Sequence, residues 1–175
     1  MPEKSENIID IFRVQIRKFP KKTKFKSSKG LDSFTYVYLC FTSKRIIVGF
    51  AEENPLGTAK YFIPGGFYIS AFKAQKEFSR KHSTIKQMNP YELINDNSNN
   101  FEIIYPNISQ FELKDAFSIF KLNFSTFEGD FKFNIWMENE FGKKYLLKKH
   151  AKPLWDRLVN VINLVAPGKL ITKIG

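Results

Sequence analysis

Short segments in which apolar and polar residues alternate fill most of this 175-residue chain, and an amphipathic helical stripe follows them. Residues 8–17 are the first such segment, in which Phe12, Val14 and Ile16 alternate with arginine and glutamine. A period of two with one polar side is typical of a β-strand that is buried on one face. This order of elements predicts a mainly β (α+β) protein closed by a single helix.

Residues 34–42 and 45–50 predict two further strands, joined by a turn at Ser43 and Lys44. Both segments are rich in β-branched and aromatic residues and are apolar on both faces, which predicts a central place in a sheet. Cys40 is the sole cysteine and lies within this pattern, so we expect it to be buried and inert. We expect the charged turn at Lys44 and Arg45 to keep this end of the strands solvated.

A second group of strands is predicted after residue 100. It covers residues 101–105, 108–113, 117–124 and 131–137. In the last two strands, apolar residues share one face: Phe120, Leu122, Phe124, Phe131, Phe133, Ile135 and Met137. A turn through Glu128 and Gly129 separates them, so these two strands predict an antiparallel hairpin.

The last regular element is a predicted helix over about residues 153–166. Pro153 fits the first turn of a helix, and Pro167 and Gly168 fit its end. A buried stripe is predicted at helical spacing, made of Leu154, Leu158, Val161, Ile162 and Val165.

Residues 51–100 interrupt the regular pattern, and we expect an insertion or an elaborated connection there. Two structures fit this segment: a hairpin turned by Pro64, Gly65 and Gly66, or a helix over residues 68–82. The residues do not distinguish between them. Asn89 and Pro90, followed by the asparagine-rich residues 95–100, predict a loop.

The formal net charge is +11, which indicates either an anionic partner or a protein kept soluble by its charge. The length and the hydrophobic fraction of 43% suit one domain, residues 1–175, with a real core. No segment approaches the roughly 20 apolar residues that cross a bilayer, and the N-terminus lacks a signal-peptide core. A sole cysteine fits a reducing compartment. We therefore expect a cytoplasmic protein that can be peripheral at membranes.

Two segments carry a resemblance to a known superfamily. Residues 39–48 read LCFTSKRIIV, which is similar to the "L-x-L-T-x-K/R-R-hydrophobic" signature of the GRAM and GLUE branches of the pleckstrin-homology (PH) superfamily. Residues 105–113 read YPNISQFEL, which is similar to their "Y-x-x-I-x-x-hydrophobic-x-hydrophobic" strand. The order of strands, basic loop and terminal helix resembles the same superfold.

The resemblance implies a PH-like, partly open barrel of about seven antiparallel strands, capped by the C-terminal helix and carrying the insertion at 51–100. The GLUE domain of an ESCRT-II subunit is the sharpest match. GLUE domains bind phosphoinositide membranes and, in many cases, ubiquitin. The resemblance therefore implies a non-enzymatic recognition module in ESCRT-type membrane trafficking.

A basic loop follows the first predicted strand, where the PH resemblance places a phosphoinositide-binding loop. Its candidate lipid- or anion-binding residues are Lys18, Lys21, Lys22, Lys24, Lys26 and Lys29. Convergent cations bind headgroup phosphates, and Phe19 and Phe25 could insert shallowly beside them. The loop lacks the Arg that follows a Lys-x step in the typical PH lipid motif, which leaves non-specific anionic binding as the expectation. The alternative is a solvated, flexible loop.

Aromatic residues of the insertion and of the last helix predict a protein-binding surface, with ubiquitin or another trafficking protein as the ligand. The candidates are Phe67, Tyr68, Phe72, Phe78 and Trp155. The alternative is that these side chains pack against the barrel. Nucleic-acid binding is a third possibility, because basic charge is interleaved with aromatic residues, but the sequence carries no nucleic-acid motif.

The sequence gives no support for catalysis. His82 and His150 are far apart, and the carboxylate pairs near residues 52 and 139 are expected in solvated turns. Pro64, Gly65 and Gly66 are not followed by the Lys-Ser/Thr of a phosphate-binding loop. We therefore expect a protein that is not an enzyme and that holds no cofactor or metal.

Overall fold

The computed structural model of the protein describes residues 5–18, 20, 36–50, 82–116, 119–136 and 151–174. Its strands are β1 (Ile8–Lys18), β2 (Tyr36–Thr42), β3 (Arg45–Phe50), β4 (Phe101–Ile104), β5 (Ile108–Ala116), β6 (Ile119–Thr126), β7 (Gly129–Trp136) and β8 (Leu170–Lys173). Its helical elements are residues 82–87, α2 (Pro90–Asn95), the 3₁₀ turn η2 (Tyr105–Asn107) and α3 (Lys152–Val165).

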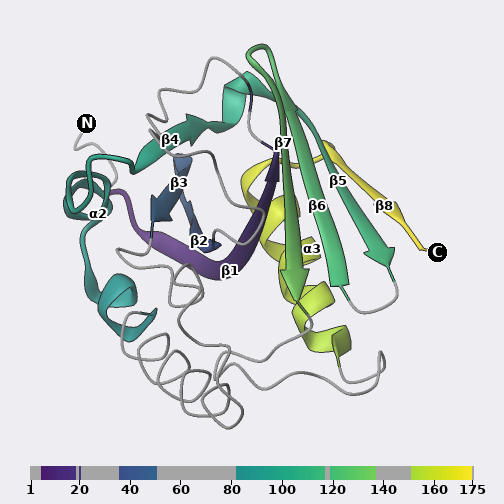
Figure 1. The fold of residues 1–175 in the computed structure, drawn as a ribbon, viewed down its shortest axis with the longest axis horizontal. Helices are drawn as coiled ribbons and strands as arrows, with labels where there is room; N and C mark the ends of the chain where they lie inside the picture. Colours follow the sequence, from purple (N-terminus) through teal and green to yellow (C-terminus); the bar gives the residue numbers. More distant parts are fainter. Residues whose placement is uncertain are drawn as a thin grey trace, which may run out of the picture.

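The eight described strands form one sheet in the order β4-β3-β2-β1-β7-β6-β5-β8. β1 joins two halves of this sheet, because its first part pairs with β2 and its last part, from Gln15 to Lys18, pairs with β7. Figure 1 shows β2–β4 and β5–β8 on two sides of the molecule, with α3 between them. The prediction of a mainly β protein is confirmed.

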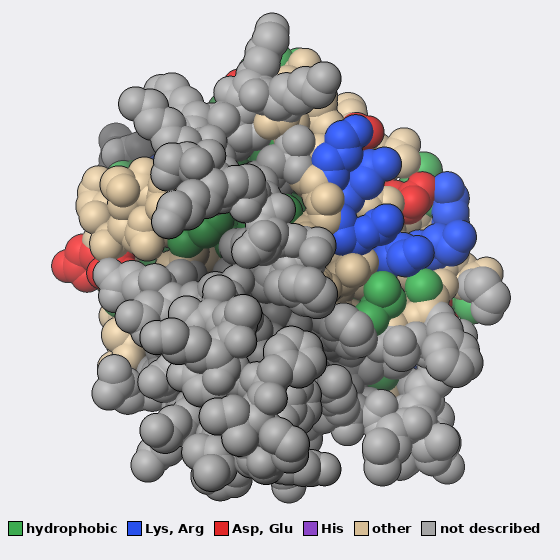
Figure 2. Space-filling model, in the orientation of Figure 1, with side chains coloured by type: hydrophobic (Ala, Val, Ile, Leu, Met, Phe, Trp, Pro, Cys, Tyr) green, Lys and Arg blue, Asp and Glu red, His purple; other side chains and the backbone are tan. Residues whose placement is uncertain are grey.

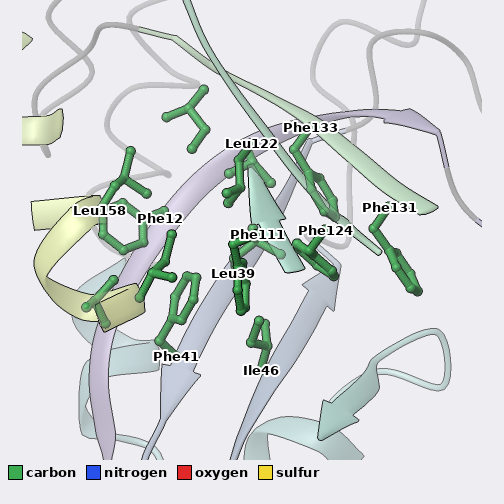
Figure 3. Packing of buried hydrophobic residues seen from close by; sticks show 14 of the residues in the cluster. Phe12, Leu39, Phe41, Ile46, Phe111, Leu122, Phe124, Phe131, Phe133 and Leu158 are labelled. Carbon is green, nitrogen blue, oxygen red and sulfur yellow. The ribbon is translucent and has the colours of Figure 1, made fainter. Parts of the chain in front are cut away.

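α3 fills the space between the two halves of the sheet. Its buried residues Leu154, Leu158, Val161 and Ile162 belong to the same hydrophobic core as the inner faces of the strands. Figure 3 shows Leu158 close to Phe12 of β1 within this core. Each such buried side chain contributes about 1.5–3 kcal/mol of hydrophobic free energy. The predicted helix and its buried stripe are confirmed, with Val165 only partly buried.

The outer face of β1–β3 is also covered. A second cluster of buried side chains joins these strands to the helical segment around α2, and its members are Ile11, Tyr38, Cys40, Ile47, Ile85 and Leu93. This explains why β2 and β3 are apolar on both faces, as predicted. Burial raises the pKa of the Cys40 thiol, which agrees with the expectation of an inert cysteine.

The prediction of a loop that begins at Asn89 and Pro90 is wrong, because these residues begin the helix α2 (Pro90–Asn95). Asn89 is the N-cap: its side chain accepts a hydrogen bond from the Tyr91 N–H at 2.9 Å. Glu92 completes a capping box by accepting the Asn89 N–H at 3.3 Å. Pro90 at the first position favours this start, so the signal for the helix was present in the sequence.

β8 was not predicted, and it makes the sheet mixed. Gly168, with a φ of 77°, ends the turn after α3 in a conformation that favours glycine. The chain then pairs with β5 in parallel, Phe111 beside Leu170 and Lys114 beside Lys173. The ammonium of Lys169 donates to the carbonyl oxygens of Tyr105 and Ile108 at 3.1 and 2.6 Å, which holds the chain at this point.

Candidate functional site

The two segments that carry the family resemblance meet at Thr42. The Tyr105 hydroxyl donates to the Thr42 carbonyl oxygen at 2.7 Å. The Thr42 hydroxyl donates to the Glu6 carboxylate at 2.6 Å and accepts the Arg45 N–H at 3.0 Å. Thr42 and Tyr105 are buried, so these motif residues join the start of β1, the β2–β3 turn and η2 inside the molecule.

Arg45 is the centre of this group, which we call the Arg45 cluster (Glu6, Thr42, Arg45, Glu102 and Tyr105). Its guanidinium pairs with Glu6 at 2.7 Å and with Glu102. It also lies over the ring of Tyr91, 4.8 Å from the ring centroid. The expectation of a solvated turn is therefore wrong for Arg45, because two carboxylates and an aromatic ring take up its charge.

The ionisation of the Arg45 cluster is fixed by these contacts. Burial alone would raise the pKa of Glu6, but hydrogen bonds from Arg45 and Thr42 outweigh it and hold this pKa below its usual value. Burial alone would lower the pKa of Arg45, and its hydrogen bonds to Glu6 and Glu102 raise it instead. The cluster thus holds one guanidinium between two carboxylates, and its role is structural.

A different set of side chains gathers on the outer face of the β5–β8 half of the sheet. We call it the lysine face, and it consists of Lys18, Lys114, Lys121, Lys132 and Lys173. In register, Lys114 lies opposite Lys121 and beside Lys173, and Lys18 lies beside Lys132. Neighbouring strands are about 4.8 Å apart, so the backbone positions of the lysines that pair in register are close together. Figure 2 shows Lys and Arg side chains gathered on the visible face over this part of the molecule.

Glu112 is the acid within the lysine face. Its carboxylate pairs with Lys173 and accepts a hydrogen bond from the Asn123 amide at 3.1 Å. The hydrogen bond from Lys173 is the main reason that the pKa of Glu112 is lowered. Asp130, at the start of β7, accepts a hydrogen bond from Ser125 at 2.8 Å. These two carboxylates leave most of the lysine charge unmatched.

Sequence reasoning missed the lysine face. Lys114, Lys121 and Lys132 stand at polar positions of alternating strands, which predicts only that each one faces solvent. Their proximity depends on the register between β5, β6 and β7, and that of Lys173 depends on the unpredicted β8. No local pattern in the sequence reports either register.

One end of the lysine face leads to the basic loop. Lys18, the first predicted lipid-binding lysine, is exposed at the end of β1. Pro20 lies against the β6–β7 turn, where a Cβ added to Gly129 would be 3.2 Å from the Pro20 Cβ. Phe127 of this turn is 76% exposed. The entrance to the basic loop, a lysine pair and an exposed aromatic ring therefore lie at the same end of the sheet.

Among the other predicted site residues, only Trp155 belongs to the described chain. It is partly buried, and its ring packs against Phe120 with the centroids 5.1 Å apart. Lys21, Lys22, Lys24, Lys26 and Lys29 lie outside the described residues, as do Phe67, Tyr68, Phe72 and Phe78.

Within the described residues there is no group of three or more His, Cys, Asp or Glu side chains that could hold a metal ion. None of the helices in that part of the chain has the length and apolar character needed to cross a bilayer.

No protein-family model and no curated protein matches the sequence. Among solved structures, the chain is similar to the hSac2 domain from human phosphoinositide phosphatase Sac2, with a TM-score of 0.43 and 8% sequence identity. The likeness covers 99% of this chain and 80% of that one. A likeness at this level shows neither a shared fold nor a shared function.

Proposed function

We propose that the protein is a non-enzymatic, PH-like recognition module of GLUE/GRAM type that binds anionic membrane surfaces in the cell. Two features support the PH-like part of the proposal. Strands β1–β4 and β5–β7 are antiparallel groups that β1 joins, and α3 packs into the core between them. The contact between Tyr105 and Thr42 also links the two segments that resemble the GRAM and GLUE signatures.

The observation that carries the lipid-binding part is the grouping at the start of the basic loop. Lys18 pairs in register with Lys132, and exposed Phe127 lies in the turn that Pro20 contacts. Clustered ammonium groups attract anionic headgroups, with about 1 kcal/mol for each Lys near the surface. The exposed Phe127 ring can enter the boundary between headgroups and acyl chains.

Co-sedimentation with lipid vesicles tests the proposal. The protein is mixed with vesicles of phosphatidylcholine alone, or of phosphatidylcholine with phosphatidylserine or a phosphoinositide. We expect it to sediment with the anionic vesicles only. Charge reversal at Lys22, Lys24 and Lys26 should abolish this binding, because these lysines follow directly from the entrance at Lys18.

A pull-down with ubiquitin, run on the same proteins, separates lipid binding from the protein-binding alternative. The triple charge-reversal variant should behave like the wild type in that assay. If the triple variant sediments with anionic vesicles as well as the wild type does, the basic loop is not the lipid site.

A further inference from the structure

We infer that the protein lies on an anionic membrane through the lysine face, so that the outer surface of β5–β8 contacts the headgroups side-on. This inference rests on the proposed function and names the surface that carries it out. The occupant is the plane of an anionic lipid leaflet, whose phosphate and carboxylate groups complement the ammonium array.

Repulsion between the lysines of this face lowers the stability of the fold. The position of these lysines in the sheet does not explain why they are there. Like charges directly opposite each other on a sheet are destabilising, and Lys114 stands opposite Lys121 and beside Lys173. Lysines often protect the edge strands of a sheet, but Lys121 and Lys132 lie on β6 and β7, which have a partner strand on both sides. Edge protection therefore does not account for them.

Among the residues that the structure describes, most lysines of this face have no ion-pair partner. Lys173 is the member that is paired, with Glu112. Lys121 and Lys132 have no hydrogen bond or ion pair with other residues that the structure describes, and Lys114 has only the electrostatic influence of nearby Glu112. Several ammonium groups on one side of a sheet match a surface of like anionic groups better than they match a single small ion.

The apolar residues at the rim of the face favour lipid over nucleic acid. Ile171 shares the face beside Glu112 and is 45% exposed, and Ile174 just beyond it is 81% exposed. Side chains of this kind can enter the acyl boundary below the headgroups. Binding of single-stranded nucleic acid relies on aromatic side chains that stack with bases, whereas Ile171 and Ile174 are aliphatic.

The test compares two double variants that remove the same charge. Lys114→Gln with Lys121→Gln neutralises the opposed pair on the lysine face. Lys86→Gln with Lys152→Gln is the matched control: both are exposed lysines of helical segments, and the surface ion pair of Lys152 with Asp156 contributes little stability. Partition of each protein onto phosphatidylcholine–phosphatidylserine vesicles is measured by sedimentation, together with its thermal unfolding midpoint.

We expect the Lys114 and Lys121 variant to bind about thirty-fold more weakly than the wild type. The control should stay within about twofold, because neither of its lysines belongs to the lysine face. Removal of a like-charge pair should leave the unfolding midpoint of the first variant unchanged or higher, so unfolding could not explain its loss of binding.

Three results would overturn the inference. Equal vesicle binding by the wild type and both variants would leave the proposed function standing and remove the lysine face from it. Absence of wild-type binding to anionic vesicles would overturn the proposed function as well. If the Lys114 and Lys121 variant lost binding to a single-stranded RNA oligonucleotide but kept its vesicle binding, the face would serve nucleic acid.

Discussion

At the scale of single residues, Arg45 is a charged turn residue whose side chain is enclosed by other residues. A Lys-Arg turn between two strands normally lies in water, yet here the guanidinium of Arg45 is enclosed by Glu6, Glu102 and the ring of Tyr91. The side chain of Glu6 is 1% exposed. Removing one partner of a buried pair leaves the other charge unmatched, which costs more than the pair itself contributes.

The Arg45 cluster makes stability depend on pH through Glu6. Because the pKa of Glu6 is lower in the folded protein than its usual value, its contribution is present above about pH 4.3 and is lost as pH falls through the folded pKa. We expect Glu6→Gln to lower the free energy of unfolding by about 1.5–3 kcal/mol near neutral pH, because Arg45 loses one charged partner and keeps Glu102. The difference from the wild type should shrink in acid, below the folded pKa.

Urea denaturation at neutral and acid pH measures this effect. Glu128→Gln is a suitable control, because Glu128 is exposed in the β6–β7 turn and its change should stay within about 0.5 kcal/mol. A Glu6→Gln variant as stable as the wild type at neutral pH would show that the cluster contributes nothing to the fold.

At the scale of elements, α3 is the part on which the two halves of the sheet depend. Leu158 is fully buried, whereas Leu164 of the same helix is 67% exposed. Leu158→Ala should cost about 2–5 kcal/mol, since it removes apolar contacts and leaves a cavity. Leu164→Ala, which has the same effect on helix propensity, should cost less than about 0.5 kcal/mol.

Thermal or chemical unfolding of the two leucine variants gives the comparison directly. Both variants change one leucine to alanine on one helix, so any difference reports burial in the core. Equal losses of stability would contradict the placement of α3 between the two halves of the sheet.

At the scale of the whole molecule, the sequence predicted those features that repeat locally. Strand periodicity gave β1–β7, with shifts of a few residues at their ends, and the spacing of Leu154, Leu158, Val161 and Ile162 gave the buried side of α3. The features that were not predicted depend on contacts between residues far apart in the sequence. β8 needed β5 as its parallel neighbour, and the enclosure of Arg45 needed Glu6 and Glu102 from other strands and turns.

The candidate site divides in the same way. Composition and the loop after β1 predicted an anionic partner, and Lys18 is exposed where that loop begins. The lysine face could not be read from the sequence, because Lys114 and Lys121 become neighbours only through the β5–β6 register. Trp155 has the sequence signature of a partner anchor, yet its contact with Phe120 takes up part of its ring.

The salt dependence of vesicle binding tests the central claim most directly. Partition of the wild-type protein onto phosphatidylcholine–phosphatidylserine vesicles is measured as salt rises from about 0.01 M to about 1 M, which shortens the Debye length from about 30 Å to about 3 Å. We predict strong binding at the low end, a steep fall as salt rises, and no binding to phosphatidylcholine alone. No binding at low salt, or equal binding to charged and uncharged vesicles, would contradict the account.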